Sequence, residues 1–145
     1  MLNVSFVHYS ALHDIPRCHS SHPTHAQTVP EWMRSSVSNR LSSTGAEWAS
    51  SFARLNSGTY NNEWLIIDYD RFVDGKPGPG TVTVVDQIPG FVSSEDVTYM
   101  LLQHSYFASY NIPWDAFIFN MSGNQVGLRR EIPVEEGWCA LRYIA

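Results

Sequence analysis

The chain has few basic residues and little cysteine. Its nine Lys and Arg are scattered over 145 residues, and the formal net charge is −5 with a pI near 5.6. Without a basic stripe to engage phosphates, the composition argues against a nucleic-acid-binding protein. The two cysteines, Cys18 and Cys139, lie near opposite ends of the chain. They therefore form neither a disulfide framework nor a CxxC metal or redox pair.

Long apolar runs and a secretion signal are also lacking. No apolar run approaches the roughly 20 residues that cross a bilayer, so no transmembrane segment is predicted. The first residues, "MLNVSFVHYSALHDIP", have no basic start and only a broken apolar stretch, which does not predict a signal peptide. The triplets at Asn3 and Asn120 nevertheless match the N-glycosylation pattern.

Histidine is concentrated in the first 28 residues, which hold five of the six. His19, His22 and His25 recur at spacing three beside Cys18, a set that could hold a metal ion. A flexible tail is the preferred interpretation, because nothing nearby supplies a rigid frame. No metal or other cofactor is predicted.

Residues 29 to 123 alternate between helix and strand patterns. Pro30 suits the first turn of a helix, and two apolar stripes at helical spacing follow it on either side of Gly45. "EWLIIDYDRF" and "TVTVVDQI" predict buried strands. "SSEDVTYMLLQ" predicts a short helix with Ser93 and Asp96 as a capping box, and a further short helix is expected around 114–119. This order predicts an α+β fold with helices on an antiparallel sheet. The two stripes are Met33, Val37 and Leu41, then Trp48, Phe52 and Leu55.

Three groups of polar residues are candidates for chemistry. The loop "NSGTYNN" before the first predicted strand holds Asn and Ser side chains that most often cap their own backbone. Asp68 and Asp70 would share one face of a strand, where a solvated strand end is the favoured interpretation over acid/base work. The third group could form a serine-hydrolase triad, but no GxSxG elbow accompanies it. Its members are Asp96, His104, Ser105, Ser109 and Asp115.

Three strings, "NSGTYNN", "DQIPG" and "SYNIP", occur in this order along the chain. Each lies within a longer segment that is similar to one protein family. Over about residues 29–123 the chain resembles the phospholipase B-like family of lysosomal or secreted glycoproteins. The resemblance implies an N-terminal nucleophile (Ntn) hydrolase fold, in which two antiparallel sheets are sandwiched between helical layers. It also implies a lipid, amide or ester substrate, attacked by a cysteine that autocatalytic cleavage exposes as a new chain N-terminus. The α-amino group of that cysteine, with a pKa of about 7.7 to 8.0, would act as the base.

The resemblance assigns roles to individual residues. Asn111 of "SYNIP" matches the pocket asparagine beside the nucleophile, where its amide would donate to the oxyanion. Asn120 matches a glycosylated asparagine. Four loop residues match the segment that shapes the same pocket: Asn56, Ser57, Thr59 and Asn61.

The nucleophile is the main departure from the family pattern, because neither Cys18 nor Cys139 occupies its position. Segments 1–28 and 124–145 do not match, and family members are several times longer. We therefore expect a partial phospholipase B-like hydrolase that is inactive as this chain and lacks the remainder of the Ntn fold. The alternative is a non-enzymatic accessory module that pairs with another chain. A small unrelated α+β domain with serine-type chemistry is the third hypothesis.

Overall fold

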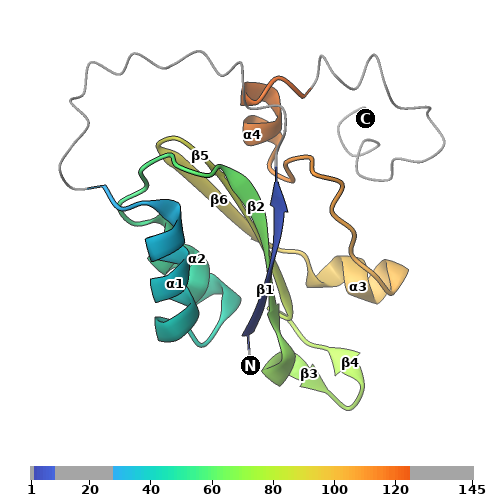
Figure 1. Cartoon of the computed structure of the whole chain (residues 1–145). Helices are drawn as coiled ribbons and strands as arrows, with labels where there is room; N and C mark the ends of the chain where they lie inside the picture. The colour runs from blue at the N-terminus through green and yellow to red at the C-terminus, as the bar shows by residue number, and fades with distance from the viewer. Residues whose placement is uncertain (1, 9–27, 125–145) are drawn as a thin grey trace.

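The computed structural model describes residues 2–8 and 28–124, with side chains from residue 28 onward (Figure 1). Two helices come first in the second range, α1 (Glu31–Leu41) and α2 (Gly45–Ala53). Two more, α3 (Thr98–His104) and α4 (Ala116–Met121), follow the strands. The strands are β1 (Leu2–His8), β2 (Asn62–Asp68), β3 (Phe72–Val73), β4 (Lys76–Pro77), β5 (Val82–Ile88) and β6 (Phe91–Asp96).

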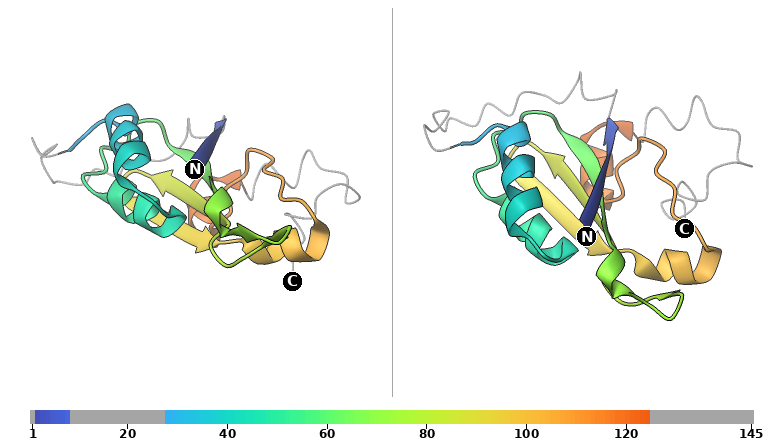
Figure 2. Two further views of the ribbon diagram at one scale, coloured as in Figure 1. Left: turned by 90° about the horizontal axis from the view of Figure 1, so that it is seen from below. Right: turned by 60° about the horizontal axis from the view of Figure 1, so that its bottom comes forward.

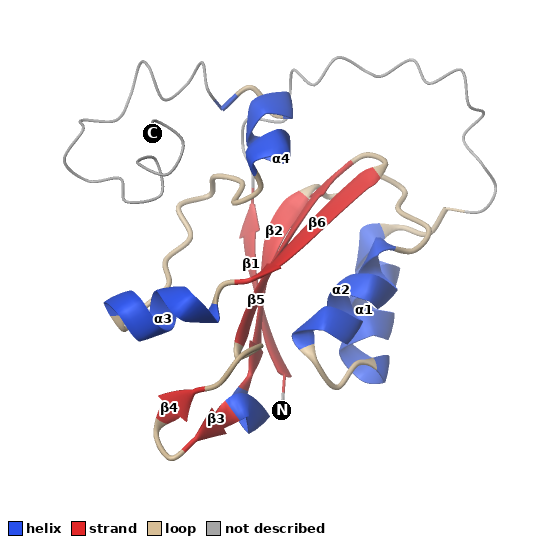
Figure 3. Ribbon diagram, turned by 180° about the vertical axis from the view of Figure 1, so that it is seen from behind, coloured by secondary structure: helices blue, strands red, loops and turns tan. Residues whose placement is uncertain are grey.

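Four strands form one antiparallel sheet in the order β1-β2-β5-β6, and β3 pairs with β4 in a short separate ribbon. The helices lie beside this sheet, as the view from behind shows (Figure 3). The α+β class predicted from the sequence is therefore confirmed, as are its two central strands. β1 lies within segment 1–28, for which we predicted no element. The described residues contain no second stacked sheet, so the Ntn sandwich stays a prediction.

An aromatic cluster joins α2 to one face of the sheet. Trp48 and Phe52 of α2 stack with ring centroids 4.7 Å apart, and Phe52 lies 4.5 Å from Trp64 of β2. All three are fully buried, and Ile66 and Val85 complete the cluster. The predicted core role of Trp48 and Phe52 is confirmed, whereas Leu55 lies beyond the helix and is exposed.

The opposite face of the sheet is covered by α3 and by the chain between α3 and α4. Val82, Val84 and Val97 are buried there, against partly buried side chains from the covering segment. Figure 2 shows α1 and α2 on one side of the sheet and α3 on the other. The covering side chains include Met100, Leu101, Phe107 and Trp114.

The buried face of α1 is polar, whereas the sequence predicted an apolar stripe there. Glu31, Arg34, Ser35 and Ser38 are the buried residues of α1. The stripe of Met33, Val37 and Leu41 is exposed instead, with Leu41 at 75%. Helical spacing identified the helix correctly but assigned the wrong face.

The capping-box prediction at Ser93 and Asp96 is wrong, because residues 91–96 form β6. The turn at Pro89 and Gly90 closes a hairpin between β5 and β6. Ser93 lies within the strand, and Asp96 accepts hydrogen bonds from the Thr98 amide and hydroxyl at the start of α3. The predicted helix near 114–119 is present as α4, where Asp115 accepts from the Ile118 amide at 2.9 Å.

Candidate functional site

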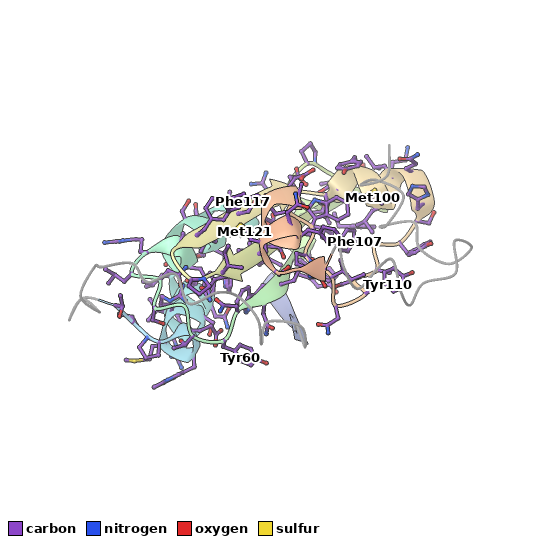
Figure 4. The ribbon with its side chains drawn as sticks, turned by 90° about the horizontal axis from the view of Figure 1, so that it is seen from above. Tyr60, Met100, Phe107, Tyr110, Phe117 and Met121 are labelled. Atoms are coloured by element: carbon purple, nitrogen blue, oxygen red, sulfur yellow. The ribbon has the colours of Figure 1, made fainter. Side chains whose placement is uncertain are left out.

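Asn111 lies in the segment that crosses the sheet between α3 and α4. Its backbone is left-handed, with φ of 62°, a conformation that asparagine tolerates better than most residues. The Oδ1 atom of its side chain is buried and makes no hydrogen bond. Figure 4 shows Phe107 of the same segment near Met100 of α3, and both pack against the buried valines of the sheet.

A small cavity of about 10 Å³ separates this segment from β2. That volume is about what one water molecule requires. Besides Asn111 Oδ1, two further buried oxygens of this region lack a hydrogen-bond partner of good geometry: Ser109 Oγ and Glu63 Oε1. Glu63 of β2 lines the cavity, and its other lining residues are Phe107, Ala108, Ser109, Tyr110, Ile112, Pro113 and Trp114.

Two buried carboxyl groups face one another beneath the segment. Glu63 of β2 is 2% exposed and stands opposite Asp86 of β5, which is 1% exposed. Burial, and to a smaller extent the negative charge of Asp86, raises the pKa of Glu63 to about 8. The nearby Ser109 hydroxyl and the Trp114 backbone oppose the rise. Glu63 is therefore mostly protonated at neutral pH.

Asp86 is tied directly to the end of the segment. Its Oδ2 accepts from the Asp115 amide at 2.7 Å, and Asp115 Oδ2 accepts from the Ser93 hydroxyl at 2.7 Å. Neither Glu63 nor Asp86 was predicted to be a site residue from the sequence. The available signal was their strand position, because an acid at an otherwise buried strand position indicates an engaged carboxyl group.

The loop residues predicted for the pocket mainly organise the loop itself. Asn56 Oδ1 accepts from the Gly58 amide, and Asn61 Nδ2 donates to the Gly58 carbonyl. Ser57 and Thr59 hydroxyls lie 2.9 Å apart. None of the four shares a hydrogen bond with Asn111, so their pocket role stays a prediction.

Arg34 and Gln87 fasten this loop to the rest of the protein. Gln87 Nε2 donates to Asn61 Oδ1 at 3.1 Å, and Gln87 Oε1 accepts from Arg34. The Arg34 guanidinium also donates to Asn56 Oδ1 and lies 4.3 Å from the Phe52 ring centroid. The loop and the Asn111 segment thus approach the same end of the sheet, where β2 begins and β5 ends.

Other predicted acid groups act as caps. Asp96 and Asp115 accept from backbone amides at the starts of α3 and α4. Asp68 is buried, accepts from the Asp70 amide and lies 3.4 Å from Arg71 Nε, whereas Asp70 is exposed. β2 ends at Asp68, so the two aspartates do not share a strand face.

Of the other triad candidates, Ser109 faces Glu63 rather than a base, while His104 ends α3 and Ser105 caps it with φ of 64°. Asn120 is exposed on α4. The histidine-rich set around Cys18, and Cys139, lie outside the described residues.

The described part of the chain shows neither a membrane-spanning helix nor a metal-binding cluster. No helix there is long and apolar enough to cross a membrane. No group of three or more His, Cys, Asp or Glu side chains among these residues is arranged to hold a metal ion.

Comparison with known proteins gives a consistent family match. The family model described as phospholipase B matches residues 19–130. The human protein named "Putative phospholipase B-like 2" is 54% identical over 99 residues, covering 67% of this chain and 17% of its own length. Phospholipase B-like protein B of Dictyostelium discoideum is 49% identical over 98 residues, with the same coverage of 67% and 17%. The chain thus spans about a sixth of the length of the curated relatives it matches.

Proposed function

The chain belongs to the phospholipase B family, and from this premise we propose that it carries the oxyanion side of a hydrolase active site. In this proposal the complete protein is an Ntn hydrolase that cleaves an acyl ester or amide bond. Another part of that protein supplies the cysteine nucleophile, so this chain is inactive on its own. Residues 29–123 are the proposed extent of the active-site module.

Asn111 carries the proposal. An acyl-transfer site needs a donor that is fixed before the negative charge develops on the carbonyl oxygen. Asn111 is held in a left-handed backbone conformation on a segment that Asp86 and Ser93 anchor through Asp115. A backbone in a sparsely populated region persists where the surroundings over-determine it, and such residues cluster at active sites. Its amide Nδ2 would donate to the oxyanion.

A lysosomal or secreted location, with glycosylation at Asn120, is part of the same proposal. Asn120 is exposed on α4, as an acceptor for a bulky glycan must be. Loss of a glycan-dependent mass shift in an Asn120→Gln variant, expressed in a secretory host, would support it.

The experiment that tests the proposed function is a substitution at Asn111 in a complete protein that contains this chain. We expect Asn111→Ala to lower kcat about 10²- to 10³-fold with little change in KM, as loss of one oxyanion donor does. Release of fatty acid from a phospholipid and of amine from an acyl amide would be measured in parallel. Asn124→Ala, outside the segment, is the control and should keep wild-type kcat. Equal activity of Asn111→Ala and wild type would exclude the donor role.

A non-enzymatic accessory module is the alternative, and one observation favours it. Exposed Met33, Val37 and Leu41, at helical spacing, leave an apolar side of α1 available to another chain. Under this alternative, a stable complex would form, and Asn111→Ala would change neither its assembly nor any turnover.

A further inference from the structure

Glu63 and Asp86 occupy one cross-strand position on the face that Asn111 covers. They are direct partners in the β2–β5 register, and the next residue across the sheet in the β5–β6 register is Ser93. Side chains at directly opposed positions have Cβ atoms about 4.5–5.5 Å apart, so the two carboxyl groups are within reach of each other. Both are almost completely buried.

Among the side chains that the structure describes, those lining the cavity next to Glu63 include a hydroxyl group and no Lys or Arg. Tyr110 lines the same cavity, and the amide of Asp115 binds Asp86. Glu95 of β6 lies in the adjacent row and accepts from Trp114 Nε1 at 2.8 Å. Two ionised carboxylates side by side in a buried site repel each other, and the pair is relieved when it retains one proton.

The pair also touches both ends of the segment that carries Asn111. Glu63 lies against Ser109 and Trp114, and Asp86 holds the amide of Asp115. We propose that Glu63 and Asp86 share one proton and that this acid–carboxylate pair is a positioning device for residues 109–115. The idea that this device positions Asn111 for catalysis rests on the proposed function. The shared proton and its effect on residues 109–115 do not.

Loss of the shared proton would place two negative charges beneath the segment. The segment would then loosen while the aromatic cluster on the opposite face stays closed, because that cluster contains neither carboxylate. We therefore expect a loss of hydrogen-exchange protection that depends on pH and is confined to this segment.

The test is residue-resolved amide hydrogen exchange of the full chain from pH 6 to pH 9, corrected for intrinsic exchange rates. We expect protection of residues 109–115 to fall at least tenfold over this range in the wild type. Glu63→Gln, a neutral isostere of the protonated acid, should change less than twofold. The matched control Glu95→Gln removes an exposed carboxylate from the same face and should keep the tenfold fall. Equal falls in wild type and Glu63→Gln would overturn the proposal.

If Glu63→Gln does not fold, a second measurement on the wild-type chain still tests the proposal. Carboxyl ¹³C NMR of the wild-type chain should show Glu63 titrating with a midpoint above pH 6, and a midpoint below pH 6 overturns the proposal. Neither measurement involves turnover. An active Asn111→Ala variant would thus exclude the proposed function and leave the carboxyl pair intact.

Discussion

At the scale of single residues, Arg34 joins several separate parts of the described chain. It is 5% exposed, and it donates to the Val29 carbonyl at 3.0 Å and to the carbonyl of Phe52. It also reaches Asn56 of the polar loop and Gln87 of β5. Burial lowers the pKa of Arg34, yet guanidinium stays charged at any physiological pH. A buried charge of this kind is tolerated because its donors are satisfied.

Arg34→Met should therefore be strongly destabilising. It leaves the Phe52 carbonyl and Gln87 Oε1 without their charged donor, and each buried acceptor left unpaired costs about 1–3 kcal/mol. Urea unfolding followed by tryptophan fluorescence measures the effect. Arg40→Met, an exposed change on the same helix, is the control and should stay within about 0.5 kcal/mol of wild type. Similar midpoints for the two variants would contradict the role assigned to Arg34.

At the scale of elements, the closest approach of α2 to the sheet occurs at Gly45. A Cβ atom added there would lie 2.8 Å from Thr83 Cβ and closer still to Thr83 Oγ1. Thr83 is 6% exposed on β5, so its side chain has little room to move. The absence of a side chain at Gly45 thus sets the distance between α2 and the sheet.

Gly45→Ala should lower the free energy of unfolding by about 1–3 kcal/mol, because overpacking outweighs the gain in helix propensity. Thermal unfolding measures the loss. The double variant Gly45→Ala/Thr83→Ala should recover part of it by removing the Thr83 hydroxyl. Ser50→Ala, exposed on the same helix, should be close to neutral. A Gly45→Ala protein as stable as wild type would show that α2 can shift freely.

Periodicity and composition predicted most of the elements but not all of their orientations. β2 and β5 could be predicted because their apolar and β-branched residues form continuous runs. β6 was not, because "FVSSED" is mostly polar and largely exposed, and its residues imitate a helix start. The buried face of α1 could not be predicted either, since Arg34 is buried through hydrogen bonds formed with distant residues.

The candidate site, like the fold, could be predicted from local sequence only in part. Asn111 was found only through a resemblance to a family, because a lone asparagine carries no pattern of its own. The Glu63–Asp86 pair depends on the register of two strands that are separated by a hairpin ribbon and loops. Cross-strand register is a tertiary property, so the pairing could not be obtained from local sequence.

At the scale of the whole molecule, the exposed apolar side chains fall on both flanks of the sheet. Trp32 and Leu41 lie on α1, and Leu102 and Phe117 lie on α3 and α4, each more than half exposed. Figure 4 shows Phe117 and Met121 together on α4. Exposed apolar surfaces of this kind are typical of places where another protein segment packs.

Stability of the whole molecule should fall as pH rises from acid to weakly alkaline. Glu63 has a pKa of about 8 in the folded protein against 4.5 as the ordinary value, and burial also raises the pKa of Glu31. A raised pKa means that the folded state binds the proton more tightly than the unfolded state does. The stabilisation is complete below pH 4.5 and is lost as pH rises to about 8. For Glu63 the difference corresponds to about 5 kcal/mol.

Urea unfolding at pH 4.5, 6, 7, 8 and 9 tests this expectation. The wild-type free energy of unfolding should decrease steadily up to about pH 8 and then level off, apart from the smaller effect of Glu31. In Glu63→Gln most of that slope should disappear, so the variant should be more stable than wild type at pH 8. If the wild-type free energy of unfolding instead rises between pH 5 and pH 8, the pKa of Glu63 is not raised in the folded protein. A decreasing profile would suit a protein that works in an acidic compartment, because the form with the proton in place is then the more stable one.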